Sequence, residues 1–134
     1  MSLSELSREF LEACRHGGSL RKIKEYIEAG ADVNVQDSLG TTAAMFAVTD
    51  QNVGLLQMLS ERSDIDCNIQ NEDGNTVALL ATKLQQYDFL QMLLQNQTEN
   101  IDWNIQNKEG NTVAIYLCFT GGNGESIECL KMLS

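Results

Sequence analysis

The residues of this chain that could carry catalytic chemistry are few and lie apart. Two carboxylate pairs stand close together in the sequence, Asp64 with Asp66 and Glu72 with Asp73, and His16 is the single histidine. Such groups act as general acids and bases when a closed pocket shifts their pKa values. Both pairs fall in segments predicted to be solvated turns, where carboxylates keep their ordinary acidity. The sequence therefore predicts no enzyme, and it places His16 at the carbonyl end of a helix.

The four cysteines do not form a recognisable metal or redox site. They are Cys14, Cys67, Cys118 and Cys129, which lie 53, 51 and 11 residues apart with no CxxC pair and no histidine cluster. We therefore expect no metal, no cofactor and four packed thiols in a reducing compartment.

Composition and charge exclude several classes of function. With 134 residues, 43% of them apolar, the chain is long enough to bury a core as one compact unit. Nineteen acidic against nine basic side chains give a net charge of −10, which disfavours nucleic acids and anionic membranes as partners. No apolar run reaches the roughly 18 residues that would span a bilayer, and no signal peptide is visible. We expect a cytoplasmic protein, with the nucleus as an alternative.

An internal repeat dominates the sequence. A six-residue motif with Asp first, Asn third and Gln fifth occurs at residues 32–37, 66–71 and 102–107, at shifts of 34 and then 36 residues. A glycine stands six residues after each Asn, and a threonine stands two residues after each glycine. A period of this length is typical of solenoid arrays.

Two apolar blocks follow each motif. The first comes directly after a threonine, which predicts a helix N-cap, and the second has the form x-Leu-polar-Met-Leu, which makes one broad helical face. The threonines are Thr42, Thr76 and Thr112, and the second blocks are residues 55–59, 89–93 and 129–133. The pattern therefore predicts that each repeat forms a turn, a helix, a short break and a second helix. In the last unit the break includes the glycine-rich residues 121–124, which lack the Lys and Ser/Thr of a phosphate-binding loop and are interpreted as a helix connection.

Together these features resemble the ankyrin-repeat family. Residues 30–34, Gly-Ala-Asp-Val-Asn, match the closing motif of that family, and residues 37–42 match its opening Asp-x-x-Gly-x-Thr. The resemblance covers essentially the whole chain. It implies an all-α fold, a solenoid of stacked antiparallel helix pairs joined by β-turn or hairpin fingers, with about three and a half to four repeats. The single domain would span residues 1–134, with repeats at approximately 3–36, 37–70, 71–106 and an incomplete 107–134.

The chain also departs from the family pattern. The Pro and His that follow the threonine in the family are absent from all three turns. In the family this histidine joins hydrogen bonds between neighbouring turns, so we expect apolar packing to link the turns here, in a less rigid array. The recurrent Asn34, Asn68 and Asn104 are interpreted as structural residues of the chain reversal, although such asparagines can be hydroxylated in this family. Trp103, far larger than its equivalents, is expected to pack inside, with contact to a partner as the alternative.

The resemblance implies that the chain binds another protein through a concave surface. This surface would consist of the turn tips and the exposed ends of the first helices. Its acidic middle tip and its apolar Leu39 and Phe119 predict a partner with a basic and partly apolar patch. The corresponding residues are Ser38, Leu39, Thr41, Glu72, Asp73, Asn75, Lys108, Glu109 and Asn111 at the tips, and Thr49, Asp50, Lys83, Leu84, Phe119 and Thr120 at the helix ends.

Two further interpretations stay open. The chain is alternatively the N-terminal substrate-recruiting or regulatory segment of a larger multidomain protein, with or without an enzymatic domain. Terminal repeats normally carry a polar outer face, which the first repeat has and the last helix lacks. That last helix therefore continues into a longer array or packs against a second copy or another protein.

Overall fold

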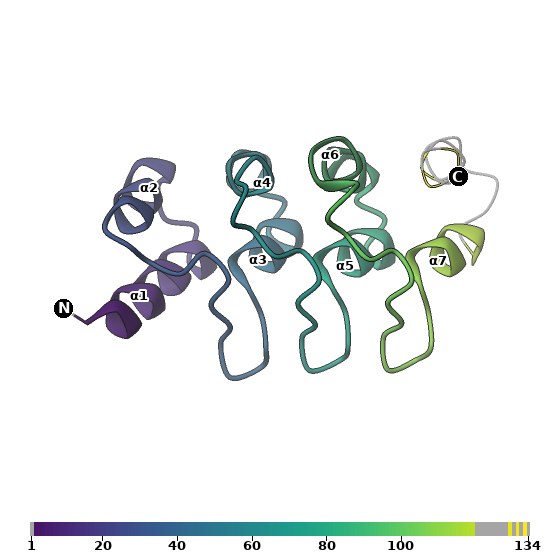
Figure 1. Cartoon of the computed structure of the whole chain (residues 1–134), viewed down its shortest axis with the longest axis horizontal. Coiled ribbons are helices and arrows are strands. Elements are labelled where there is room, and N and C mark those ends of the chain that lie inside the picture. The colour runs from purple at the N-terminus through teal and green to yellow at the C-terminus, as the bar shows by residue number, and fades with distance from the viewer. Residues whose placement is uncertain (1, 120–128, 130, 132, 134) are drawn as a thin grey trace.

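The computed structural model describes residues 2–119 together with residues 129, 131 and 133. Within these residues the chain forms seven α-helices and no strand (Figure 1). The helices are α1 (Leu3–Arg15), α2 (Leu20–Glu28), α3 (Ala43–Thr49), α4 (Val53–Ser60), α5 (Val77–Lys83), α6 (Tyr87–Gln97) and α7 (Val113–Phe119). None of these described helices is long and apolar enough to cross a membrane. Residues 129, 131 and 133 are helical too, whereas the glycine-rich residues 121–124 lie outside the described part.

The helices stack in two rows. Figure 1 shows an inner row of α1, α3, α5 and α7, an outer row of α2, α4 and α6, and three loops that project from the inner row on the opposite side. Contacts join the two helices of each pair, neighbouring helices of the inner row, and α4 with α6. We call the three loops finger 1 (residues 31–42), finger 2 (residues 65–76) and finger 3 (residues 101–112). This arrangement is the predicted all-helical solenoid.

Threonine side chains start the inner helices, as the sequence predicts. The hydroxyls of Thr42, Thr76 and Thr112 accept the backbone N–H three residues further on, at 3.4, 3.2 and 3.3 Å. The helices that they cap have only seven residues each. Because the first four N–H groups of a helix have no partner within it, a cap matters most in helices as short as these.

The core lies between the two rows and between neighbouring helix pairs. Leu55, Leu56 and Leu59 of α4 are fully buried, as are Leu90 and Leu93 of α6. Burial of one leucine side chain stabilises the fold by roughly 1.5–3 kcal/mol. One helix pair cannot enclose its own apolar face, so this burial exists only when pairs stack.

The break between the two helices of each pair is a left-handed turn. Gly17 occupies it in the first pair (φ 71°), whereas Gln51 (φ 56°) and Gln85 (φ 59°) occupy it in the next two. The N–H of the following residue then donates to the carbonyl five residues back, at 2.7, 2.8 and 2.7 Å. Asn52 goes on to cap α4 by accepting an N–H at 3.1 Å, but Gln86, one methylene longer, makes no capping bond to α6.

We predict that Gln86→Asn stabilises the protein. Asparagine would supply the cap that α6 lacks, as Asn52 does for α4, and the expected gain in the free energy of unfolding is about 0.5–1 kcal/mol. Urea denaturation of the variant and the parent measures the difference. The reverse exchange, Asn52→Gln, should lose a similar amount, and equal stabilities in both comparisons would contradict the capping argument.

Candidate functional site

One polar residue in the middle of each finger closes the turn at its tip. The Oδ1 of Asp37 accepts the backbone N–H of Leu39 and of Thr41, both at 2.9 Å. Asn71 and Asn107 accept the corresponding pairs of N–H groups in fingers 2 and 3. Side chains of this type hold turns by bonding to nearby backbone groups. The tips therefore have a defined shape although they contain no helix or strand.

The backbones of neighbouring fingers are hydrogen-bonded to each other. The N–H of Glu72 donates to the carbonyl of Leu39 (2.9 Å), and the N–H of Lys108 donates to the carbonyl of Asp73 (3.0 Å). This approach is so close that a Cβ on Gly74 would lie 2.8 Å from the Lys108 nitrogen. Gly74 also has a φ of 78°, which side-chain-bearing residues rarely adopt. A glycine is thus required here both by the turn and by the stacking.

Glutamine side chains add a second link between fingers. Gln36 Nε2 donates to the Gly40 carbonyl of its own finger (2.9 Å) and to the Gln70 carbonyl of the next finger (3.2 Å). Gln70 Nε2 donates in the same way to Gly74 (2.8 Å) and Gln106 (3.1 Å). The expectation that apolar packing would replace the missing histidine network is therefore wrong. The turns are linked by hydrogen bonds, and amide side chains supply the donors.

The recurrent asparagines join the bases of the fingers. Asn34 donates to the Asp64 carbonyl (2.9 Å), and its Oδ1 accepts the N–H of Asp66 (2.8 Å). Asn68 makes the same two bonds with the next repeat, at 3.0 and 2.8 Å. The structural interpretation is confirmed for these two residues. Asn104 lies in the last finger that the structure describes; it is exposed, and its side-chain amide bonds to none of the described residues.

Two buried polar residues that were not predicted from the sequence, Ser7 and Gln97, also bond to backbone groups of distant segments. In the first repeat, which has no finger, the Ser7 hydroxyl accepts the N–H of Asp32 at 2.8 Å. Gln97, at the end of α6, donates to the carbonyls of Ser60 (2.7 Å) and Arg62 (3.2 Å). The only signal was a polar residue at a helical position otherwise expected to be apolar.

Most of the predicted binding residues are on the surface. Those exposed are Ser38, Leu39, Thr49, Asp50, Glu72, Asp73, Lys83, Leu84, Lys108, Glu109 and Phe119, while Thr41 and Asn111 are half-buried. Asn75 is different, because only 1% of it is exposed and its Oδ1 accepts the side-chain N–H of Asn107 at 2.8 Å. Asn75 is a link between fingers 2 and 3, so its assignment to the binding surface was wrong. Thr120 lies outside the described residues.

Exposed apolar side chains are concentrated on this surface. Among the described residues, five large apolar side chains are exposed: Leu3, Leu39, Val53, Leu84 and Phe119. Three of them belong to the predicted set, with exposed fractions of 53% for Leu39, 44% for Leu84 and 74% for Phe119. Leu3 and Val53 instead begin α1 and α4.

A half-buried apolar row extends the same surface along the inner helices. Phe46, Leu80 and Tyr116 each lie four residues after the capping threonine of α3, α5 and α7, and each packs partly against the core. Residues three or four positions apart share one face of a helix, so this row adjoins the predicted helix ends. These three residues were not among those predicted from the sequence, although all three lie at the same distance from the capping threonine.

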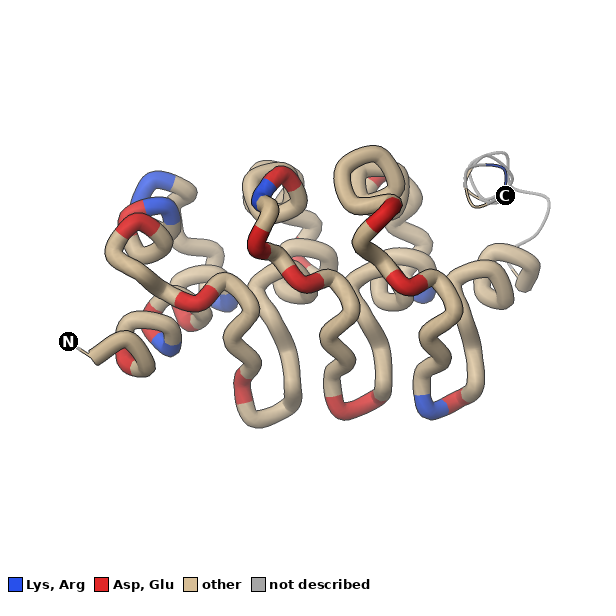
Figure 2. The backbone as a smooth tube through the Cα atoms, in the orientation of Figure 1, with Lys and Arg blue, Asp and Glu red and all other residues tan. Residues whose placement is uncertain are grey.

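The charges of the surface are uneven. Figure 2 shows acidic positions at the tips of the first two fingers and a basic position beside an acidic one at the third. Glu72 and Asp73 make no ion pair within the described residues, whereas Lys83 of α5 lies 3.5 Å from Glu109 of finger 3. Lys108 is the one cation within finger 3, residues 101–112. Two unpaired carboxylates therefore stand at the middle of the array.

Three of the groups considered for catalysis, His16, Asp64 and Asp66, are bonded to neighbouring residues. His16 Nε2 lies 3.1 Å from a Glu12 carboxylate oxygen, and both residues are exposed at the end of α1. Arg62 donates to both oxygens of Asp64 at 2.8 and 3.0 Å, and these hydrogen bonds hold the pKa of the Asp64 carboxyl below its ordinary value. Asp66 accepts the N–H of Asn68 at 2.9 Å. No cluster of three potential metal ligands occurs in the described part of the chain.

The cysteines divide into three buried thiols and one exposed thiol. Cys14, Cys67 and Cys129 are 2%, 5% and 0% exposed, as expected for packed thiols, but Cys118 is exposed, so the prediction was wrong for that residue. Burial raises the pKa of Cys14 to about 12 and, together with the nearby Asp66 carboxylate, that of Cys67 to about 11.

Trp103 is half-buried and packs against the core, as expected. Its indole N–H donates to the carbonyl of Thr98 at 3.2 Å, so the ring is also bonded to the segment that joins α6 to finger 3.

We predict that Cys118 is the reactive thiol of the folded protein. At pH 8 the thiols of Cys14 and Cys67 should be almost entirely protonated, and their reaction with a soluble thiol reagent should be slower by about 100-fold or more. Stopped-flow labelling of the native chain should show one fast phase. Cys118→Ser should remove that phase, and a fast phase that survives in this variant would contradict the assignment.

We predict that Asn68→Ala destabilises the array by about 1–3 kcal/mol, because it leaves a carbonyl and an N–H without a partner between two fingers. Asn104→Ala is the matched control, since it removes the same residue type at the same repeat position where the side chain makes no such bridge. Chemical denaturation measures both free energies of unfolding. Equal losses in the two variants would show that the bridge contributes nothing.

Comparison with known proteins agrees with this geometry. A search of curated proteins finds no match to the chain. The family model of ankyrin repeats in three copies matches residues 10–107, which contain the second half of α1, helices α2 to α6 and the first two fingers complete. Ankyrin repeats generally mediate interactions between proteins and are typically not enzymes. On its repeats, its stacked fingers and this match, the chain belongs to the ankyrin-repeat family.

Proposed function

We propose that this protein binds a partner protein on the surface formed by the finger tips and the exposed ends of the inner helices. We call this the finger surface and define it by Leu39, Glu72, Asp73, Leu84 and Phe119 together with their exposed neighbours. The observation that carries the proposal is that, of the five large apolar side chains exposed among the described residues, three lie on it. Apolar side chains left in water at one surface are typical of an interaction site.

The charge of the finger surface favours a partner with a basic patch. The carboxylates of Glu72 and Asp73 project at the middle finger with no cation paired to them in the described residues. Unpaired surface charges act on the rate of association and on the choice of partner, because they attract the opposite charge before contact. A partner with a basic patch is therefore favoured over an acidic one.

The apolar part of the partner would meet Leu84 and Phe119. These residues lie at the ends of α5 and α7, next to the half-buried side chains of Leu80 and Tyr116. Large apolar and aromatic groups that lose water on binding supply most of the affinity of a protein interface, whereas charges at its rim supply less. We therefore propose that Leu84 and Phe119 supply most of the affinity, and that the carboxylates at the tip of finger 2 attract the partner before contact.

The stacking of the fingers suits them to this role. Backbone bonds between Glu72 and Leu39 and between Lys108 and Asp73 hold neighbouring tips together. Surfaces that are ordered before binding lose less conformational entropy when a partner docks. Tip side chains can also differ without disturbing the core, because the turn is closed by Asp37 and its equivalents.

We predict that the double variant Glu72→Lys and Asp73→Lys loses partners that the parent chain retains. Affinity capture from cell extract, compared by quantitative mass spectrometry, identifies those partners, and titration with one purified partner measures the affinity. Binding should weaken by about threefold to tenfold at low salt, and its dependence on salt should flatten, because the steering charge is reversed.

The matched control is Glu28→Lys with Glu99→Lys, which changes the net charge equally at exposed residues that follow or end the outer helices. This control should keep the partners. If both double variants behave alike, binding follows overall charge and the finger surface is not the site. A further variant, Phe119→Ser, should reduce affinity at all salt concentrations, since its contribution is apolar.

A further inference from the structure

A groove lies between helix α1 and finger 1, at the N-terminal end of the finger surface. Its volume is about 370 Å³, and the exposed Ser38 of the predicted binding set lines it. Two shielded apolar residues line it too, Leu11, which is 5% exposed, and the half-buried Val35. Arg8 and Arg15 of α1 complete the wall on the helix side. The groove therefore combines apolar surface with two guanidinium groups.

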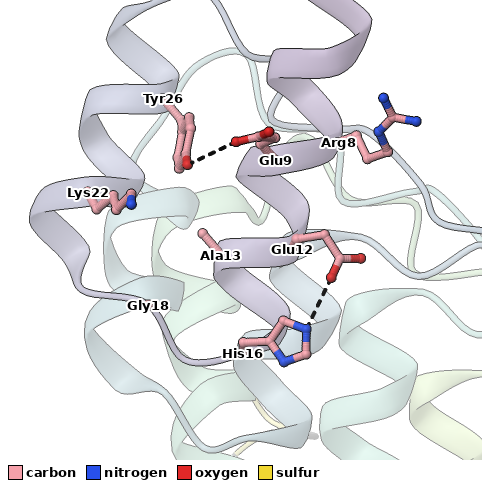
Figure 3. A pocket seen from close by; sticks show the side chains of 8 residues that line it. All are labelled: Arg8, Glu9, Glu12, Ala13, His16, Gly18, Lys22 and Tyr26. Atoms are coloured by element: carbon pink, nitrogen blue, oxygen red, sulfur yellow. Dashed lines mark hydrogen bonds and ion pairs between the residues drawn. The ribbon is translucent and has the colours of Figure 1, made fainter.

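The two arginines lie on one face of α1 and have free donors. They are seven residues apart in the helix, and such positions share a face. Arg8 makes no hydrogen bond or ion pair with the described residues, and Figure 3 shows its guanidinium directed away from Tyr26 and Lys22. Arg15 lies 3.6 Å from Glu12, which is too far for a hydrogen bond. The N–H donors of both guanidinium groups are therefore available to a ligand.

The carboxylates of the groove, in contrast, are already bonded. Asp37 Oδ1 accepts the two N–H groups that close finger 1. One oxygen of Glu12 faces Arg15, and the other lies 3.1 Å from His16 (Figure 3). An incoming cation would compete with these contacts, whereas an incoming carboxylate can accept two parallel N–H groups from one guanidinium. The groove therefore favours an acidic group over a basic one.

The same positions change character along the inner row of helices. The positions of Glu12 and Arg15 in α1 recur at shifts of 34, 34 and 36 residues, and the last pair is aromatic. The successive pairs are Glu12 and Arg15 in α1, Phe46 and Thr49 in α3, Leu80 and Lys83 in α5, and Tyr116 and Phe119 in α7. The finger surface is therefore charged at its α1 end and apolar at its α7 end, and it distinguishes the two ends of a ligand.

We propose that the finger surface binds a protein segment whose acidic residues occupy the groove between α1 and finger 1 and whose apolar residues meet α7. This inference rests on the function proposed above and adds the polarity of the partner. The basic patch that faces the tip of finger 2 lies between the two ends, since finger 2 stands between fingers 1 and 3 (Figure 1).

The length of the array sets the length of such a segment. Helices that pack side by side about 8–10 Å apart place α1 and α7, three steps apart, at about 24–30 Å. An extended segment of about eight or nine residues spans this distance. The net charge of −10 does not prevent an acidic group from docking, because at physiological salt charges are screened beyond about 8 Å.

Selection of random nine-residue peptides, displayed on phage, against the parent chain tests this polarity. Enriched peptides should carry Asp or Glu toward one end and Leu, Phe or Trp toward the other. Selection against the double variant Arg8→Ala and Arg15→Ala should remove the acidic preference and keep the apolar one. A synthetic peptide enriched on the parent should bind this variant about threefold to thirtyfold more weakly by fluorescence anisotropy at low salt. The difference should shrink as salt is raised.

The matched control is Arg21→Ala with Lys24→Ala. It removes two exposed cations of α2, and Arg21 lies 3.7 Å from a carboxylate of its own helix, much as Arg15 does. This control should keep both the enriched peptides and their affinity. Circular dichroism checks that both double variants are folded.

Three results would overturn the proposal: enriched peptides without acidic residues, an acidic preference that survives in the arginine variant, or an equal loss of affinity in the control. In each case a loss of peptide binding in Phe119→Ser would still support the finger surface as the site. Peptides that bind equally well to Phe119→Ser and to the arginine variant would contradict the proposed function too, and a selection that enriches no peptide would count against both.

Discussion

The stacking of each helix pair on the next is the interaction on which the rest of this structure depends. Helices of seven residues, such as α3, α5 and α7, are too short to be stable alone in water. Their apolar faces are buried only because a neighbouring pair covers them, as with Leu55 and Leu90 in the outer row. Stability in such an array is a sum of terms between nearest neighbours, so an end that lacks a neighbour has a different surface from the middle.

Hydrogen bonds between neighbouring fingers hold the loops in the same stacked order as the helices. The amide side chains of Asn34, Asn68, Gln36 and Gln70 each reach from one repeat to the next. An amide offers both donors and an acceptor, so one side chain can satisfy two backbone groups at once. This chemistry takes over the linking role that a histidine network has in the family, and it explains how a chain without those histidines still aligns its fingers.

In this array, one set of residues stabilises the fingers, and a different set is exposed for contact with a partner. The residues that close and align the fingers, such as Asp37 and Gly74, bond to backbone groups, and the residues between them project outward. The tip of finger 2 can therefore carry two unpaired carboxylates, Glu72 and Asp73, at little cost to the fold. The exposed side chains therefore determine which partner such a surface binds, because the main-chain geometry is the same in all the repeats.

The sequence by itself determined the fold class, the threonine caps of α3, α5 and α7 and most of the exposed tips. These features follow from local signals, namely the repeat period, the threonine before each apolar run and the turn residues between them. Only the tertiary structure decided which polar or apolar residues face a neighbouring repeat. Asn75 is buried although it stands beside the tip, because Asn107 of the next finger bonds to it, and Cys118 is exposed although its equivalents are buried, because no following pair covers it in the described chain. Contacts between repeats join residues more than 30 positions apart, and no local pattern records them.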